Sequence, residues 1–291
     1  LHADYMAANH AIKMMSTLGK DKPFFLGVGL VRPHVPLVAP KRFFTPFPNK
    51  AMVLAQAVKD DLKDVPKAAQ KMKNFPRYGM NEEQQKKALS AYYASVSFMD
   101  AQVGRLLDAL KANGLEDNTI VLFMSDHGWN LGEHDCWQKT SLWEDVIRTP
   151  LIISVPGSKV AGQKCDRIVE HTDIYPTLVD LCGFKPPKAL KGQSMTSLLS
   201  DPASTAWVDK PAYTVTYNGS GESLRTDEWH LNLWSDGRQG VELYDVKTDP
   251  GEFTNLAKDP KHAATLKTLT AQLRGLRAKF GGKTPKPRPP R

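Results

Sequence analysis

The sequence lacks any long apolar run. Nothing in its 291 residues approaches the roughly 18 consecutive apolar residues of a membrane-spanning helix, so a membrane partner is not expected. The opening Leu1-His2-Ala3-Asp4-Tyr5 is neither an initiator methionine nor a charged segment followed by an apolar one, so it does not have the pattern of a signal segment. This start indicates a chain entered midway, and we expect a further amino-terminal segment of the same protein upstream.

Cysteine is scarce. Cys136, Cys165 and Cys182 make an odd count, and no two of them have the C-x-x-C spacing of zinc or redox motifs. One disulfide is possible, but a disulfide framework is excluded. Cysteine usage therefore leaves the cellular compartment open.

The net charge of +8 has two interpretations, solvated lysines or an anionic substrate. The lysines are scattered, and no recognition helix, zinc finger or RNA-binding signature accompanies them, so nucleic acid is not the expected partner. Much of the charge lies in the Pro/Lys/Arg-rich tail, residues 283–291, which we expect to be disordered.

Apolar periodicity predicts an α/β fold. Helical spacing runs from Ala3 to Leu18 and, in a long helix, from Glu82 to Asn113. Short, wholly apolar runs, typical of strands buried on both faces of a parallel sheet, occupy Pro23–Leu30, Thr119–Met124 and Pro150–Val155. Strands that alternate with long helices predict a mostly parallel sheet.

Two other regions differ in composition and periodicity. Phe43–Asn81 is Pro-rich and weakly periodic, and we expect a surface excursion at a pocket rim, whose truncation alters substrate preference more than folding. Beyond about Thr205, short alternating segments predict a small antiparallel sheet followed by a helix from about His262 to Phe280. The expected domains are therefore 1–204 (an incomplete α/β domain), 205–282 (the α+β domain) and the tail.

The segment SDHGWNLGEHDCWQK, residues 125–139, carries the most chemical information. Asp126 and His127 directly follow a predicted buried strand, and ligands bind at the carboxyl ends of strands in open α/β sheets. An anionic oxygen beside a neutral nitrogen makes a plausible pair of metal ligands. The alternative is that Asp126 caps the next helix and His127 has no role.

This segment resembles the iduronate-2-sulfatase branch of the sulfatases. Three further segments are similar to the same family and occur in the same order: FFLGVGLVRPHVP from Phe24, SAYYASVSFMDAQVGRLL from Ser90, and SLRTDEWHLNLW…ELYDVKTDPGEFTNLA from Ser223. Each motif is weak alone, but four in order are specific. The resemblance implies the distal half of an alkaline-phosphatase-like sulfatase domain, with a location that is periplasmic, secreted or lysosomal.

The resemblance also implies roles for individual residues. Asp126 and His127 would bind one divalent cation, usually Ca²⁺, although calcium prefers oxygen ligands. Lys139 and His34 would contact the sulfate, as catalytic and substrate-binding residues, and His134 would line the substrate side of the pocket. The alternatives are a surface lysine, a histidine that rigidifies its loop, and a structural hydrogen bond at His134. Sulfated carbohydrate is the implied substrate, and a glycosaminoglycan is one such class.

The family nucleophile is a cysteine in C-x-P/A-S-R that is oxidised to formylglycine. The three cysteine contexts, Cys136-Trp-Gln-Lys-Thr, Cys165-Asp-Arg-Ile-Val and Cys182-Gly-Phe-Lys-Pro, do not match it, and the family's paired metal-binding aspartates have no counterpart either. Both are expected upstream of Leu1, and we expect this chain to be inactive alone.

Two rival functions remain open. A phosphoesterase of the same superfamily needs a second metal, for which His134, His171 and Asp173 are the spare candidates, although Asp173 is also placed to cap a helix. A sulfated-glycan-binding protein without catalysis would have kept the scaffold and lost the nucleophile.

Overall fold

The computed structural model describes residues 2–18, 22–56, 58–70, 76–216 and 219–285. The chain divides into two compact units: one made of residues 1–56, 77–121 and 154–157, the other of residues 57–76, 122–153 and 158–291. The boundary expected near Thr205 stays a prediction. No helix in the described ranges is both long and apolar enough to cross a membrane.

Helices occur in both units. The α-helices are α1 (Ala3–Met15), α2 (Glu82–Ala112), α3 (Glu144–Ile147), α4 (Ile174–Leu181), α5 (Thr196–Ser200) and α6 (Ala263–Lys279). An Asn81 capping box begins α2, because the Asn81 side chain accepts from the Gln84 amide while the Gln84 side chain accepts from Asn81. The predicted spans of α1, α2 and α6 are confirmed to within three residues.

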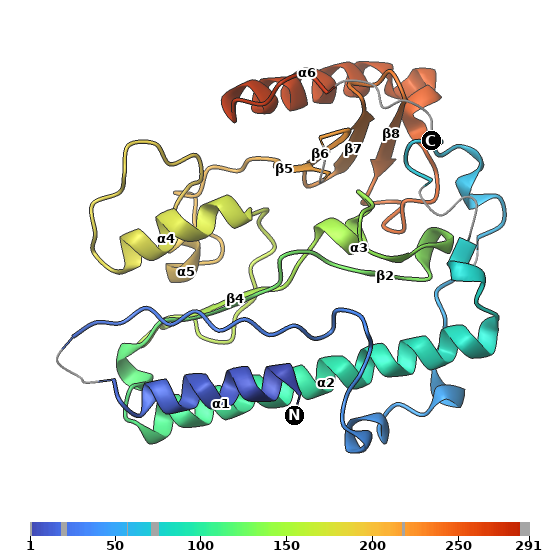
Figure 1. The fold of residues 1–291 in the computed structure, drawn as a ribbon. Helices are drawn as coiled ribbons and strands as arrows, with labels where there is room; N and C mark the ends of the chain where they lie inside the picture. The colour runs from blue at the N-terminus through green and yellow to red at the C-terminus, as the bar shows by residue number, and fades with distance from the viewer. Residues whose placement is uncertain (1, 19–21, 57, 71–75, 217–218, 286–291) are drawn as a thin grey trace. The chain divides into compact units, whose positions relative to one another are not determined.

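The first compact unit is built on α1 and α2, which lie side by side (Figure 1). Their shared core contains Met15, Leu110 and Leu115, with Phe24 and Leu26 of the following apolar segment packed against it. That segment has no strand, so the strand predicted over Pro23–Leu30 is wrong for the described residues. A strand needs a neighbour for its backbone hydrogen bonds, and Phe25, 89% exposed, shows that one face is uncovered.

The strands of the described residues form three small sheets. Two sheets have two strands each: β1 (Val121–Met124) with β4 (Leu151–Ser154), and β2 (Asn130–Leu131) with β3 (Trp137–Gln138). The third has four strands, which neighbour one another in sequence order: β5 (Ala212–Val215), β6 (Gly221–Arg225), β7 (Trp229–Trp234) and β8 (Gly240–Asp245). Both β1 and β4 lie where the sequence predicts strands. Burial on both faces is wrong for β4, however, because Ile152 is 61% exposed.

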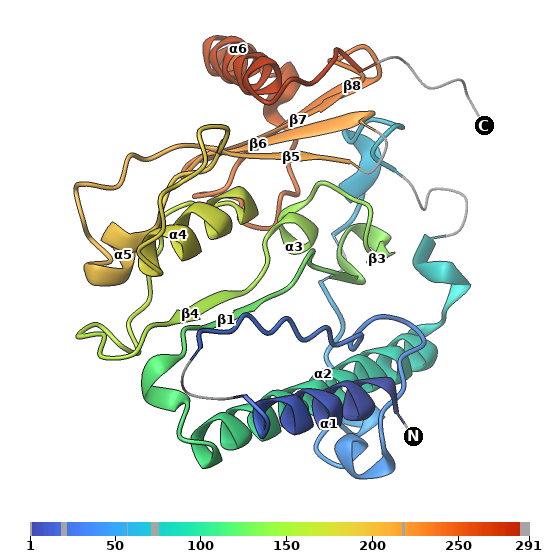
Figure 2. The ribbon, with the colours of Figure 1, turned by 60° about the vertical axis from the view of Figure 1, so that its left-hand side comes forward.

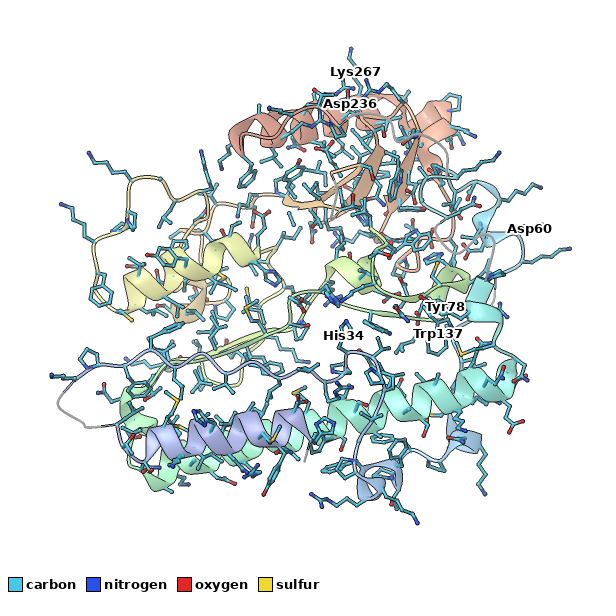
Figure 3. The ribbon with its side chains drawn as sticks, viewed as in Figure 1. His34, Asp60, Tyr78, Trp137, Asp236 and Lys267 are labelled. Carbon is cyan, nitrogen blue, oxygen red and sulfur yellow. The ribbon has the colours of Figure 1, made fainter. Side chains whose placement is uncertain are left out.

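The carboxy-terminal sheet β5–β8 is antiparallel throughout, as predicted. Helix α6 lies across one face, where Leu269 and Leu273 pack against leucines of β6, β7 and β8 (Figure 2). Lys267 is on the outer side of α6 and extends into solvent (Figure 3). Arg277 ties the helix down, because its Nε lies 2.8 Å from Oε1 of the buried Glu222.

The opposite face of this sheet is polar and buried. The cross-strand neighbours Asn232 and Glu242 lie on it with His230 and Tyr244. Glu242 accepts hydrogen bonds from Trp234 Nε1 at 2.5 Å and from the Tyr244 hydroxyl at 2.9 Å, and burial raises the pKa of Glu242 to about 7. The aromatic members of this face belong to the core that holds the loops of the candidate site.

Part of the excursion over residues 43–81 also belongs to that core. Val65 and Ala69 are buried against Cys136 and Trp143. Pro66 lies so close to Gly240 that a Cβ there would come within 2.2 Å of the proline Cβ. The expected surface position is therefore wrong for Val65 and Ala69, and the effect of truncation on substrate preference and folding stays a prediction. Residues 57 and 71–75 lie outside the described ranges, as do residues 286–291 of the predicted disordered tail.

Val65→Ala should lower the free energy of unfolding by about 1–3 kcal/mol, because it removes two buried methyl groups from a packed core. Val53→Ala is the matched control: Val53 belongs to the same excursion but is 85% exposed, so its truncation should cost less than about 0.5 kcal/mol. Urea denaturation curves of the two variants provide the measurement. Equal midpoints would contradict a core role for the excursion.

Candidate active site

The loop that follows β1 is fixed by its backbone. The Gly128 amide donates to the Val146 carbonyl at 2.7 Å, and the Trp129 amide donates to the Asp145 carbonyl at 2.8 Å. These bonds bring the loop so close to α3 that a Cβ on Gly128 would lie 2.1 Å from the Asp145 oxygen. Glycine is therefore required here, and its close approach to α3 fixes the two residues before it.

Those residues are Asp126 and His127, the predicted metal ligands. His127 Nδ1 lies 2.8 Å from the Gly128 carbonyl. A carbonyl only accepts, so Nδ1 carries the hydrogen, and Nε2 of the neutral ring holds the lone pair that a metal would use. Nε2 and Asp126 Oδ2 are 3.8 Å apart, and the Asp126 side chain is 85% exposed. The spacing and the tautomer fit two neighbouring ligands of one divalent cation.

Lys139 follows the β2–β3 hairpin, in which Asn130 pairs with Gln138. Backbone φ is positive on both sides of the lysine, 73° at Gln138 and 86° at Thr140, and again at the tip of the hairpin, 52° at His134 and 56° at Asp135. Such values are uncommon for residues other than glycine, and they concentrate at functional sites. Lys139 is thus flanked on both sides by residues in a costly backbone conformation.

His134, at the tip of this hairpin, is 4% exposed. Its Nδ1 lies 3.0 Å from Asp61 Oδ2, and its ring stacks on Trp143 with centroids 4.2 Å apart. Burial lowers the pKa of His134, but the Asp61 carboxylate outweighs it, and the net pKa is raised. Contact of His134 with substrate stays a prediction, and the geometry gives this side chain a structural hydrogen bond.

His34 belongs to the other compact unit. The buried Asp4 accepts from the amides of Val31 and Arg32 at 2.9 and 3.0 Å, and Arg32 Nη1 donates to the His34 carbonyl at 2.6 Å. His34 Nδ1 lies 2.8 Å from the Val35 carbonyl and therefore carries the hydrogen. The His34 side chain is exposed. Its convergence with Lys139 on one sulfate stays a prediction.

Helix α3 is held by two side chains of the carboxy-terminal region, Arg225 of β6 and Glu252 of the loop after β8. Glu252 Oε2 accepts from the Glu144 amide at 2.9 Å, and Glu252 Oε1 contacts Nδ1 of the buried His230. Arg148 Nη1 lies 3.9 Å from Glu144 Oε1, whereas Arg225 Nε approaches Glu144 Oε2 at 2.9 Å. Asp145, the next residue of α3, has its pKa raised to about 6, chiefly by burial and then by nearby carboxylates.

Glu144, His230 and Glu252 also bring three potential metal-ligand atoms within 4.8 Å of one another. Their hydrogen-bonding capacity is already used: Glu252 binds His230 and the Glu144 amide, while Ser223 Oγ lies 2.6 Å from His230 Nε2. The Arg225 guanidinium supplies the positive charge that Glu144 needs. We interpret the cluster as a buried ion network.

The spare ligands for a second metal have other partners. Asp173 is fully buried, is part of a capping box with Glu170, and lies 2.8 Å from Lys210 Nζ. His171 Nε2 lies 3.0 Å from the Thr149 hydroxyl. Within the described residues, neither belongs to a group of three potential metal ligands. The Asp173 side chain caps the short 3-10 turn His171–Asp173, but it makes no side-chain cap at the start of α4.

The sequence reasoning missed Asp61, Asp4 and the network around Glu252. Nothing in Lys59-Asp60-Asp61-Leu62 separates Asp61 from other surface acids, because its partner is 73 residues away. Cys165 and Cys182 are free and exposed, and Cys136 is buried.

Comparisons with known proteins identify the family of this chain. Residues 4–184 match the sulfatase family model, and residues 132–279 match the model for the N-sulphoglucosamine sulphohydrolase carboxy-terminal region. A sulfatase of Formosa agariphila is 33% identical over 94% of this chain and 54% of its own length. The iduronate 2-sulfatase of Mus musculus is 28% identical over 91% of this chain and 64% of its own length.

Solved structures share the fold. A protein in complex with its substrate D-glucosamine-2-N,6-O-disulfate matches with a TM-score of 0.79 at 24% identity, over 98% of this chain and 71% of its own. The phosphonate monoester hydrolase of Silicibacter pomeroyi matches with a TM-score of 0.79 at 24% identity, over 96% of this chain and 60% of its own. The chain spans about half the length of the first two curated relatives, 54% and 58%. With its alkaline-phosphatase-like α/β fold, this chain belongs to the sulfatase family.

Proposed function

We propose that this chain forms the distal part of the active site of a sulfuric-ester hydrolase that acts on sulfated carbohydrate, in the manner of the iduronate-2-sulfatases. The proposal depends chiefly on the loop after β1, where the Gly128 approach to α3 fixes Asp126 and His127 with a 3.8 Å ligand spacing and the required tautomer. A location outside the cytosol, in the periplasm, lysosome or medium, is part of the same proposal.

The chemistry of sulfate esters gives each residue a task. Cleavage builds negative charge on the sulfuryl oxygens and on the departing alkoxide. A cation held by Asp126 and His127, for which Ca²⁺ is the proposed ion, would stabilise the charge on the sulfuryl oxygens. Lys139 supplies a second positive charge, held by a backbone that needs no rearrangement during the reaction.

His34 is proposed to serve the leaving oxygen. Because its Nδ1 hydrogen is used by the Val35 carbonyl, the protonated ring donates from Nε2, and general-acid help of this kind typically contributes about 10²–10⁴-fold. The 291 residues contain no cysteine in a formylglycine context. The nucleophile is therefore proposed to lie in sequence that this chain does not include.

The substrate class is tested with the sulfate, phosphate and phosphonate esters of one aryl alcohol, since phosphonate monoester hydrolases share this fold. The protein expressed from its complete gene should hydrolyse the sulfate ester fastest, and the 291-residue chain alone should hydrolyse none of the three. A preference for the phosphate or phosphonate ester would favour the phosphoesterase alternative. Binding of sulfated glycans without hydrolysis by the complete protein would favour the glycan-binding alternative.

Lys139→Ala should lower kcat for the sulfate ester by about 10²–10³-fold, because one fixed positive group at the sulfuryl oxygens is lost. Lys185→Ala, which removes an exposed lysine, is the control and should leave kcat unchanged. Steady-state kinetics of both variants in the complete protein give the answer. An active Lys139→Ala variant would remove Lys139 from the mechanism.

Asp126→Asn should weaken Ca²⁺ binding by about tenfold or more, since the carboxylate charge count sets calcium affinity. The exposed Asp117 provides the control Asp117→Asn, which should bind Ca²⁺ like the parent. Isothermal titration with Ca²⁺ alone, on the complete protein freed of metal, measures this without any activity assay. Equal affinities would show that Asp126 is no ligand.

A further inference from the structure

The hairpin that carries Lys139 has little regular structure of its own. Its two strands are two residues each, and the Gly132 amide bonds to the Cys136 carbonyl at 2.9 Å across the tip. A two-stranded hairpin of this size is at best marginally stable in water, and the positive φ values at His134 and Gln138 add to its cost. Contacts outside the hairpin must therefore determine its conformation.

The contact between Asp61 and His134 is suited to that task. It joins two segments 73 residues apart in sequence, with Asp61 Oδ2 at 3.0 Å from His134 Nδ1. Both side chains are largely buried. The second carboxylate oxygen of Asp61 is buried as well and has no hydrogen-bond partner in the described part of the chain. The buried carboxylate thus depends on His134 for its compensation.

Stacking on Trp143 fixes the orientation of the His134 ring. Its ring lies nearly parallel to the Trp143 indole, at an interplanar angle of 20°. Trp143 immediately precedes α3, the helix whose carbonyls bind Gly128 and Trp129. The hydrogen bond to Asp61 and the stack on Trp143 together connect the hairpin tip to the loop that carries Asp126 and His127.

We propose that Asp61 and His134 are positioning residues, and that their buried pair holds the β2–β3 hairpin so that Lys139 faces the same sulfate group as the loop after β1. The catalytic consequence rests on the proposed function, whereas the ordering of the hairpin does not.

The pair is poorly explained as a device for stability alone. Buried ion pairs often contribute little net free energy of folding, since desolvation offsets the attraction, and their best-attested use is to fix one arrangement among several. Val65 and Ala69 already attach the excursion to the core by apolar packing. The pair adds a directional contact at the hairpin tip, where the backbone is strained.

Hydrogen exchange tests the ordering. In the complete protein, Asp61→Asn should speed exchange of the amides of residues 130–140 by about tenfold and leave those of α6 unchanged. Asp64→Asn is the matched control, because Asp64 lies in the same excursion but accepts from the Asn255 amide at 2.9 Å. Unchanged hairpin exchange in Asp61→Asn, or equal acceleration throughout the protein, would overturn the proposal.

Kinetics test the link to Lys139. Asp61→Asn should lower kcat for the sulfate ester by about 10- to 100-fold with little change in KM, as misplacement of a catalytic group does. In a Lys139→Ala background, the same substitution should cost less than about twofold. If Asp61→Asn lowers kcat by the same 10- to 100-fold in the Lys139→Ala background, positioning through Lys139 is wrong, while the sulfatase function still stands. If the parent hydrolyses no sulfate ester, the proposed function fails, and hydrogen exchange still decides the ordering.

If Asp61→Asn does not fold, the double variant Asp61→Leu/His134→Phe replaces it. That variant removes donor and acceptor together, so no buried group is left unpaired, and it keeps a ring to stack on Trp143. The same two measurements then apply, with the same expected and contrary results.

Discussion

The close approach of Gly128 to the Asp145 carbonyl is the constraint on which the candidate site depends. It consumes the amides of Gly128 and Trp129, leaves no space for a side chain, and fixes how Asp126 and His127 leave β1. The same approach makes α3, a helix of one turn, the support of the site. An isolated helix of that length is unstable in water, so contacts with other parts of the chain must maintain it.

Those contacts come from distant parts of the sequence. Glu252, in the loop after β8, accepts from the amide at the start of α3, and Arg225 of β6 binds Glu144. The Trp143 ring, just before α3, is buried among residues of the excursion and of the carboxy-terminal sheet. The antiparallel sheet β5–β8 is therefore part of the support of the loop after β1, although helix α6 and the apolar core beneath it lie on the other face of the sheet.

Local patterns were enough to predict much of the fold. The 3.6-residue periodicity located α1, α2 and α6, and apolar runs located β1 and β4. Those runs led to a wrong expectation for Pro23–Leu30, because strand formation depends on a neighbour that periodicity does not encode. The burial of Val65 and Ala69 was missed for a similar reason: both lie in a Pro-rich segment without a period, and their core partners are distant in sequence.

The site itself was predictable only where chemistry is local. The position of Asp126 and His127 after a strand, and of Lys139 beyond the G-E-H segment, follows from order along the chain. Long-range contacts such as Asp61–His134 are invisible to that reasoning, and they include the contacts that fix the backbone around Lys139.

The burial of Glu252 beneath α3 has a consequence for how such sequences can diverge. One carboxylate serves the backbone of α3 through one oxygen and His230 of the sheet through the other. Substitution of His230 is therefore tolerable only where the new side chain is cationic or can donate a hydrogen bond to Glu252. The loop that carries Glu252 can neither shorten nor shift without releasing α3. Substrate specificity must therefore evolve in segments that do not contact Glu252 or α3.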